Sequence, residues 1–195
     1  MSQTKTIRSE ADAKTIFCFW FYLITDCVLF ASLFATFVVL RNNTFGGPSG
    51  ETLFSLPFVL AQTVILLASS FSCGLGILAA RQGKLKPTLV AFGTTFVLGL
   101  MFLGLELKEF SNLYHEGNSW RRSGFLSAFF TLVGTHGAHI TAGLIWIAVM
   151  VYRLWQLGLT DFNIKRLTML SLFWHFLDIV WIFIFTIVYL AGIAL

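Results

Sequence analysis

Residues 124–146 read GFLSAFFTLVGTHGAHITAGLIW, and this run decides the fold class. The run continues to about residue 152 without an Asp, Glu, Lys or Arg. An α-helix needs about 20 apolar residues to cross a hydrocarbon core that is about 30 Å thick. The run therefore predicts a transmembrane helix, and it raises the question of why His136 and His139 lie inside it.

The composition of the whole chain is that of a membrane protein. Of its 195 residues, 57% are hydrophobic and 11% are charged, and the mean hydropathy is +0.82, whereas soluble domains have about 25% charged residues. The apolar runs are continuous rather than alternating, which favours helices over an outer-membrane barrel. No basic cluster is interleaved with exposed aromatic residues, so the sequence predicts no nucleic-acid partner.

Four other segments resemble the first in length and apolarity. The predicted spans are about 16–40, 53–80, 88–110, 124–152 and 168–194. We predict an all-α fold, a polytopic membrane protein built as a bundle of five transmembrane helices. Residues 1–15 are predicted to be a cytoplasmic polar tail, and residues 16–195 to be a single membrane domain.

The basic residues predict the orientation of these helices. Nine of the 13 Lys and Arg residues lie in the N-terminal tail and in the second and fourth connections, which share one side of the membrane. Cytoplasmic segments of membrane proteins carry an excess of Lys and Arg. The N-terminus is therefore predicted to be cytoplasmic and the C-terminus to lie outside.

Six acidic or imidazole side chains within the spans are singled out, because a charge there costs about 2.5–3.5 kcal/mol on insertion scales. They are Asp26, Glu106, His136, His139, His175 and Asp178. At about 1.5 Å of rise per residue, the two Asp side chains are expected roughly 15 Å deep, with His139 and His175 in the same layer. Glu106 is expected apart from this layer, near the outer interface, as an anchor beside Lys108. Asp26 is expected either to hold helices together or to relay protons.

The histidines admit three interpretations. Three His and two Asp would be enough metal ligands, but His136 and His139 do not form an HExxH motif, and no Glu-x-x-His pair recurs as di-iron bundles require. A proton or ion path remains open. The small residues Gly134, Ala138 and Ala142 are expected to let another helix approach closely. This favours buried, hydrogen-bonded structural histidines.

Several motifs, taken together, resemble a known family. The most diagnostic are GTHGAHI at 134–140 and WHFLD at 174–178, and FWFYLITDCVLFASLFATF (19–37) and LGLELKEFSNLY (103–114) accompany them. They resemble subunit III of haem–copper terminal oxidases, from about residue 16 to the end. The likeness is greatest to the subunit III of bacterial cytochrome bo-type ubiquinol oxidases, to which FGGPSG and LPFVLAQT also point.

The resemblance implies a non-catalytic subunit of a complex that reduces oxygen to water and translocates protons. It implies no cofactor on this chain, with haems and copper in the large catalytic subunit I, and with subunits II and IV as further partners. The subunit is expected to bind phospholipid in a cleft between helix groups, and to support assembly and sustained turnover of the complex.

The resemblance also bears on single residues and on location. Asp26 stands where many relatives have Glu, a position associated with lipid and with proton uptake. His136, His139, His175 and Asp178 occupy signature positions that the family uses for structure rather than redox ligation. The chain resembles the short, five-helix form, and the expected location is the bacterial inner membrane, multi-pass, with a periplasmic C-terminus.

Alternative functions remain open. Some cytochrome c oxidases also use the short form, so the same role in such an oxidase is one alternative. A small proton or ion transporter is a second, although no internal repeat of the kind that marks many transporters is present. An independent redox or di-metal membrane enzyme is a third.

Overall fold

The computed structural model of the chain describes residues 2–44 and 56–190, with side-chain environments from Lys14 onward. Over these ranges the elements are helical and no β-strand occurs, which confirms the all-α prediction. The elements are α1 (Ser2–Leu40), α3 (Leu56–Arg81), α4 (Leu85–His115), α5 (Gly124–Leu157), α6 (Asp161–Ile184) and the π-helix η1 (Phe185–Leu190). The polar tail predicted for residues 1–15 is helical from Ser2, continuous with the first span.

Five helices in the described part of the chain are long and apolar enough to cross a membrane. The spans are Lys14–Leu40, Leu56–Arg81, Leu85–His115, Gly124–Leu157 and Asp161–Leu190. They confirm the predicted number of spans, but several helices run beyond the predicted ends. Apolarity marks the part of a helix in hydrocarbon, whereas the backbone hydrogen-bond ladder continues into the polar interface.

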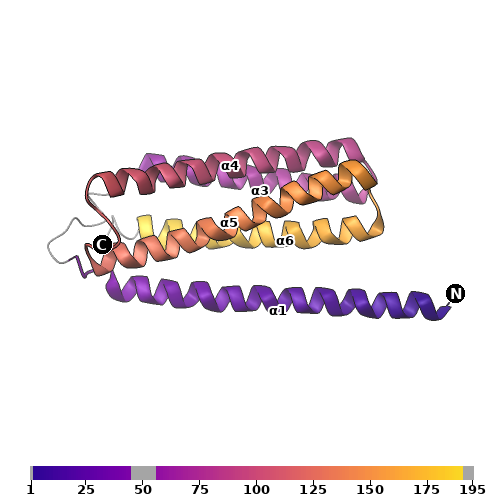
Figure 1. The fold of residues 1–195 in the computed structure, drawn as a ribbon, viewed down its shortest axis with the longest axis horizontal. Coiled ribbons are helices and arrows are strands. Elements are labelled where there is room, and N and C mark those ends of the chain that lie inside the picture. The colour runs from indigo at the N-terminus through magenta and orange to yellow at the C-terminus, as the bar shows by residue number, and fades with distance from the viewer. Residues whose placement is uncertain (1, 45–55, 191–195) are drawn as a thin grey trace.

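Four of the helices form the body of the protein, and α1 lies against one side of it (Figure 1). Helix α3 packs against α4 and α6, and α5 packs against the same two helices. Helix α1 packs mainly against α5 and α6. The N-terminus, the α3–α4 connection and the α5–α6 connection lie at the same end of the molecule (Figure 1), so the three basic segments of the sequence are brought together.

The core of the four-helix body is aromatic, and α6 supplies its largest members. Trp174 and Trp181 are fully buried. The indole Nε1 of Trp174 donates to Ser69 Oγ at 3.1 Å, and that of Trp181 donates to Thr63 Oγ1 at 3.1 Å. Both bonds tie α6 to α3. A buried indole N–H needs such a partner, so these bonds fix the rotation of α6.

Glycines on α4 and α5 make room for Trp174. A Cβ on Gly99 would come within 2.9 Å of Trp174 Cη2, and one on Gly143 within 2.9 Å of Cζ3. Within this chain the close approach uses Gly143, whereas Ala138 and Ala142 of the predicted ridge are exposed and pack against none of its helices. Steps of four residues drift around an α-helix of 3.6 residues per turn, so the ridge leaves the buried face.

The helix ends follow from local sequence. Ser123 and Thr160 accept hydrogen bonds from the backbone N–H groups of Leu126 and Asn163, each at 3.2 Å, and so cap α5 and α6. Gly83 follows α3 with φ 72°, a left-handed conformation that favours glycine. These capping residues determine where the helices begin and end, and therefore how short the connections between them are.

Candidate functional site

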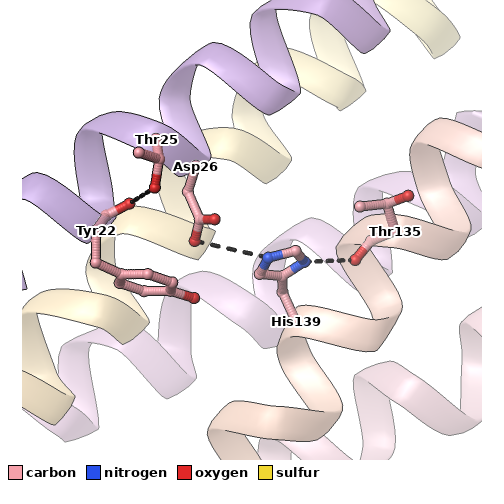
Figure 2. A network of polar contacts seen from close by, with 5 residues as sticks. All are labelled: Tyr22, Thr25, Asp26, Thr135 and His139. Carbon is pink, nitrogen blue, oxygen red and sulfur yellow. Dashed lines mark hydrogen bonds and ion pairs between the residues drawn. The ribbon is translucent and has the colours of Figure 1, made fainter.

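Asp26 on α1 and His139 on α5 form a polar contact inside the predicted membrane region (Figure 2). Asp26 Oδ2 lies 3.6 Å from His139 Nε2, and the Asp26 residue is only 7% exposed. The other imidazole nitrogen, Nδ1, donates to the Thr135 carbonyl at 2.8 Å. Tyr22 lies one turn earlier on α1, on the same side of the helix as Asp26 (Figure 2).

The geometry of this pair constrains where its protons sit. A carbonyl oxygen only accepts, so His139 Nδ1 carries a proton and the tautomer is fixed. At 3.6 Å the contact between Nε2 and Oδ2 is longer than a hydrogen bond, and Asp26 Oδ2 has no hydrogen-bond partner within the described residues. The pair is a close approach of two polar groups that joins α1 to α5.

His136 lies in an aromatic enclosure. Its ring is fully buried and stacks on Trp181, with centroids 5.3 Å apart and planes at 30°. Phe102 meets it edge-on at 6.0 Å and Phe30 at 6.4 Å. Within the described residues neither ring nitrogen has a hydrogen-bond partner. The expected burial is thus present, while the expected hydrogen bond is not found in this part of the chain.

Glu106 is buried between α4 and α5 rather than at the outer interface. It is 2% exposed, and a Cβ on Gly137 would come within 2.8 Å of its Oε1. The expectation of an interfacial anchor is therefore wrong. Helix α4 continues to His115, so Glu106 lies about 13 Å inside the helix end. The Glu106 carboxyl group lies against Gly137, the glycine that follows His136, whereas the adjacent Lys108 is exposed.

Sequence reasoning missed a polar contact close to Glu106. Tyr189 is fully buried, and its hydroxyl donates to Glu109 Oε2 at 3.4 Å. Tyr189 belongs to the π-helix η1, whose wider turn changes the direction of side chains relative to an α-helix. The amide of Gln62 on α3 is also buried. The sequence feature that could have indicated this contact is Glu109 itself, because residues i and i+3 of an α-helix are neighbours and Glu109 is therefore close to Glu106.

His175 and Asp178 turn toward α3 instead of toward the other polar residues. His175 Nδ1 and Ser70 Oγ share a hydrogen bond of 2.6 Å. The predicted pairing of His175 and Asp178 on one helix face is correct, and the three side chains border a hollow of about 390 Å³.

The six predicted residues fall into three separate places in the helix bundle. One pair joins α1 to α5, His136 and Glu106 lie in the interior near α4, and His175 with Asp178 faces α3. Across residues 14–44 and 56–190, no three His, Cys, Asp or Glu side chains gather as a metal site would need. The arrangement links helices through pairwise polar contacts.

Comparison with known proteins decides the family. The family model for cytochrome c oxidase subunit III matches residues 11–193. This chain belongs to that family. The recognition made from the motifs is confirmed, and the family is a subunit of haem–copper oxidases, so the chain has partner oxidase subunits.

Individual relatives cover nearly the whole chain. The cytochrome bo(3) ubiquinol oxidase subunit 3 of Pseudomonas aeruginosa is 54% identical over 183 residues, 94% of this chain and 88% of the relative. The quinol oxidase subunit 3 of Bacillus subtilis (strain 168) is 45% identical over 187 residues, 96% of this chain and 92% of the relative. The cytochrome c oxidase subunit 3 of Bacillus sp. (strain PS3) is 47% identical over 176 residues, which are 90% of this chain and 85% of the relative.

Proposed function

We propose that this chain is the non-catalytic subunit III of a proton-pumping quinol:oxygen oxidoreductase of the cytochrome bo type. The observation that carries the proposal is the 54% identity, over 94% of the chain, to a cytochrome bo(3) ubiquinol oxidase subunit 3. In this role the haems and copper belong to subunit I, and subunits II and IV complete the complex. The chain is a multi-pass protein of the bacterial inner membrane, with its N-terminus in the cytoplasm.

The geometry of the polar residues supports a bracing role. The contact of Asp26 with His139 links α1 to α5, and that of His175 with Ser70 links α6 to α3. His136 packs among rings, as a structural side chain does. These contacts join helices that are distant in sequence, which suits a subunit that maintains the shape of a larger assembly.

The electron donor is tested by the substrate of the purified complex. We expect the complex that contains this chain to oxidise ubiquinol and to leave ferrocytochrome c unoxidised. A short-form cytochrome c oxidase is the second candidate, favoured by the 47% identity to a cytochrome c oxidase subunit 3. Rapid oxidation of ferrocytochrome c by the same preparation would select this candidate.

A groove between α1, α3 and α6 suits the phospholipid expected for this family. Its volume is about 430 Å³, and Phe19 and Trp20 contribute to an apolar wall. Arg81 and Lys165 line it at the end of the molecule where the basic segments gather (Figure 1). Two cations above an apolar groove fit an anionic headgroup with its acyl chains below.

The lipid proposal is tested by lipid analysis of the purified complex. The double variant Arg81→Gln/Lys165→Gln removes two charges from the groove and is expected to lose bound anionic phospholipid. The matched control Lys84→Gln/Lys86→Gln removes two charges from exposed positions at the same end. Equal lipid content in the two variants would argue against the groove.

A further inference from the structure

Glu106 is an acidic side chain enclosed where α4 meets α5. It is 2% exposed, and its Oε1 would lie 2.8 Å from a Cβ on Gly137, so the carboxyl group packs directly against the backbone of α5. Its other oxygen, Oε2, is buried and has no hydrogen-bond partner within the described residues. We call this contact the Glu106–Gly137 seam. Because the chain itself encloses Oε2, a side chain of a partner subunit does not reach it.

No cation of this chain lies against the seam. Among the described residues, the one acid–base contact at ion-pair distance joins Asp26 to His139 and does not involve Glu106. Residues 45–55 and 191–195 contain no Lys, Arg or His. The N-terminus, with its basic residues, lies at the end of the molecule opposite the α4–α5 connection, whereas Glu106 is in the last third of α4 (Figure 1). Glu106 therefore has no counter-ion from its own chain.

The ionisable groups around the seam supply no compensating charge. On α4, Glu109 lies one turn after Glu106 and accepts from the Tyr189 hydroxyl of η1 at 3.4 Å, while Lys108 is exposed. On α5, His136 is fully buried among aromatic rings, and neither of its nitrogens has a partner within the described residues. Helix α3 carries no Asp, Glu, Lys, Arg or His before its last residue. An ionised Glu106 would therefore face a second acid and no positive charge.

These surroundings determine the charge of Glu106. A carboxylate that loses its water and gains neither a cation nor a hydrogen bond is strongly disfavoured, so the group keeps a proton instead. Glu109, one turn away on the same face of α4, would add like-charge repulsion. Glu106 is therefore expected to be uncharged while the seam is closed, and to ionise only where water reaches it.

We propose that Glu106 is a proton-dependent latch, which lets α4 and α5 close at Gly137 only while its carboxyl group carries a proton. When the seam opens, Glu106 meets water and releases that proton, because a glutamate in water is ionised at neutral pH. Opening is thus coupled to the loss of one proton, and its equilibrium constant rises about ten-fold per pH unit. Higher pH favours the open seam, and lower pH favours the closed seam.

The first test measures opening of the seam in the purified complex by amide hydrogen exchange at residues 134–140, under conditions in which exchange follows the opening equilibrium. Glu106→Gln keeps the size of the side chain and removes its titratable proton. Comparison with the wild type at the same pH cancels the intrinsic exchange rate. We expect the ratio of the wild-type opening constant to that of Glu106→Gln to rise about ten-fold per pH unit between about pH 6 and about pH 8.

The matched control is Glu116→Gln, which changes an exposed acid at the end of α4. Its opening constant is expected to keep a fixed ratio to that of the wild type over the same pH range. A ratio for Glu106→Gln that is equally independent of pH overturns the proposal. Failure of Glu106→Gln to assemble also overturns it, because an uncharged side chain of the same size should keep the seam closed.

The second test locates the proton by infrared spectroscopy of the complex at neutral pH. A protonated carboxyl group has a carbonyl stretch that is distinct from the stretches of a carboxylate. We expect the difference between wild type and Glu106→Gln to contain this band, and the difference between wild type and Glu109→Gln to lack it. A band that is lost only in Glu109→Gln would place the proton on the other acid and overturn the proposal.

Discussion

His139 Nε2 lies 3.6 Å from Asp26 Oδ2, and this contact attaches the outer helix α1 to the four-helix body. Helix α1 packs mainly against α5 and α6, and its contact with the rest of the protein is less extensive than that of any helix of the body. The pair therefore lies at the weakest junction of the fold. This position connects a buried polar contact with the mechanical integrity of the subunit.

Replacement of Asp26 by Leu is expected to loosen α1 without removing haem from the complex. The change leaves His139 Nε2 without its acidic partner, at a cost of about 1–3 kcal/mol. Thermal unfolding in detergent, the haem spectrum and the decay of oxidase activity during turnover are the measurements. Asp26→Asn, which keeps an acceptor oxygen, is expected to be milder. An Asp26→Leu complex with unchanged stability and unchanged endurance would contradict this role.

The His136 ring is expected to act through packing. His136→Ala opens a cavity beside Trp181 and Phe102, with an expected loss of about 2–4 kcal/mol in the free energy of unfolding. His136→Phe keeps an aromatic ring and is expected to recover most of that loss. The oxygen-reduction rate per haem should be unchanged in both. If the Phe variant is as unstable as the Ala variant, the ring nitrogens are essential and the packing explanation fails.

Gly137 is expected to be required by Glu106. The Cβ of Gly137→Ala would come within 2.8 Å of Glu106 Oε1, and such overpacking costs about 1–3 kcal/mol. Gly134→Ala is the control, because the nearest atom to its Cβ is Phe110 Cε2 at 3.8 Å. In the double variant Gly137→Ala/Glu106→Ala, the Glu106 carboxyl group is removed, and this should relieve the clash. A double variant whose destabilisation equals the sum of the single effects would show that the two positions are independent.

Ser69 is expected to be a stabilising junction of three helices. Its Oγ donates to the Thr95 carbonyl at 3.2 Å and accepts from Trp174 Nε1 at 3.1 Å. Ser69→Ala leaves the buried indole N–H unpaired, which costs about 1–3 kcal/mol in denaturant unfolding of the detergent-solubilised chain. The control Ser32→Ala removes a hydroxyl that bonds only the Leu29 carbonyl of its own helix. Similar unfolding midpoints for both variants would argue against the junction.

The fold could be predicted from the sequence because a spanning helix must be apolar along its whole membrane length. The run at 124–152 carries that signal by itself, and the structure contains a helix there from Gly124 to Leu157. The positions of the helix ends were predicted less accurately, because polar residues at the membrane interface can continue a helix as readily as they can begin a loop. The basic segments were correctly assigned to one end (Figure 1).

The partners of the polar residues were harder to predict, because they depend on how each helix is rotated. Glu106 shows the difficulty: Lys108 beside it indicated an interface, but the carboxyl group faces Gly137. The bond from Trp174 to Ser69 joins residues 105 positions apart, and neither side chain is ionisable. A search for ionisable groups within apolar spans therefore does not find it. Pairs on one helix, such as His175 and Asp178, were predictable from their spacing.

The central claim is that the buried acids and imidazoles brace helices, while electron transfer belongs to partner subunits. The most direct test is to purify the complex from membranes, separate this chain from its partners, and record metal content and haem absorbance for each fraction. We predict a chain with no haem or copper, recovered from a complex whose large subunit contains both. Stoichiometric haem or copper on the separated chain, lost on replacement of His136 or His139, would contradict the account.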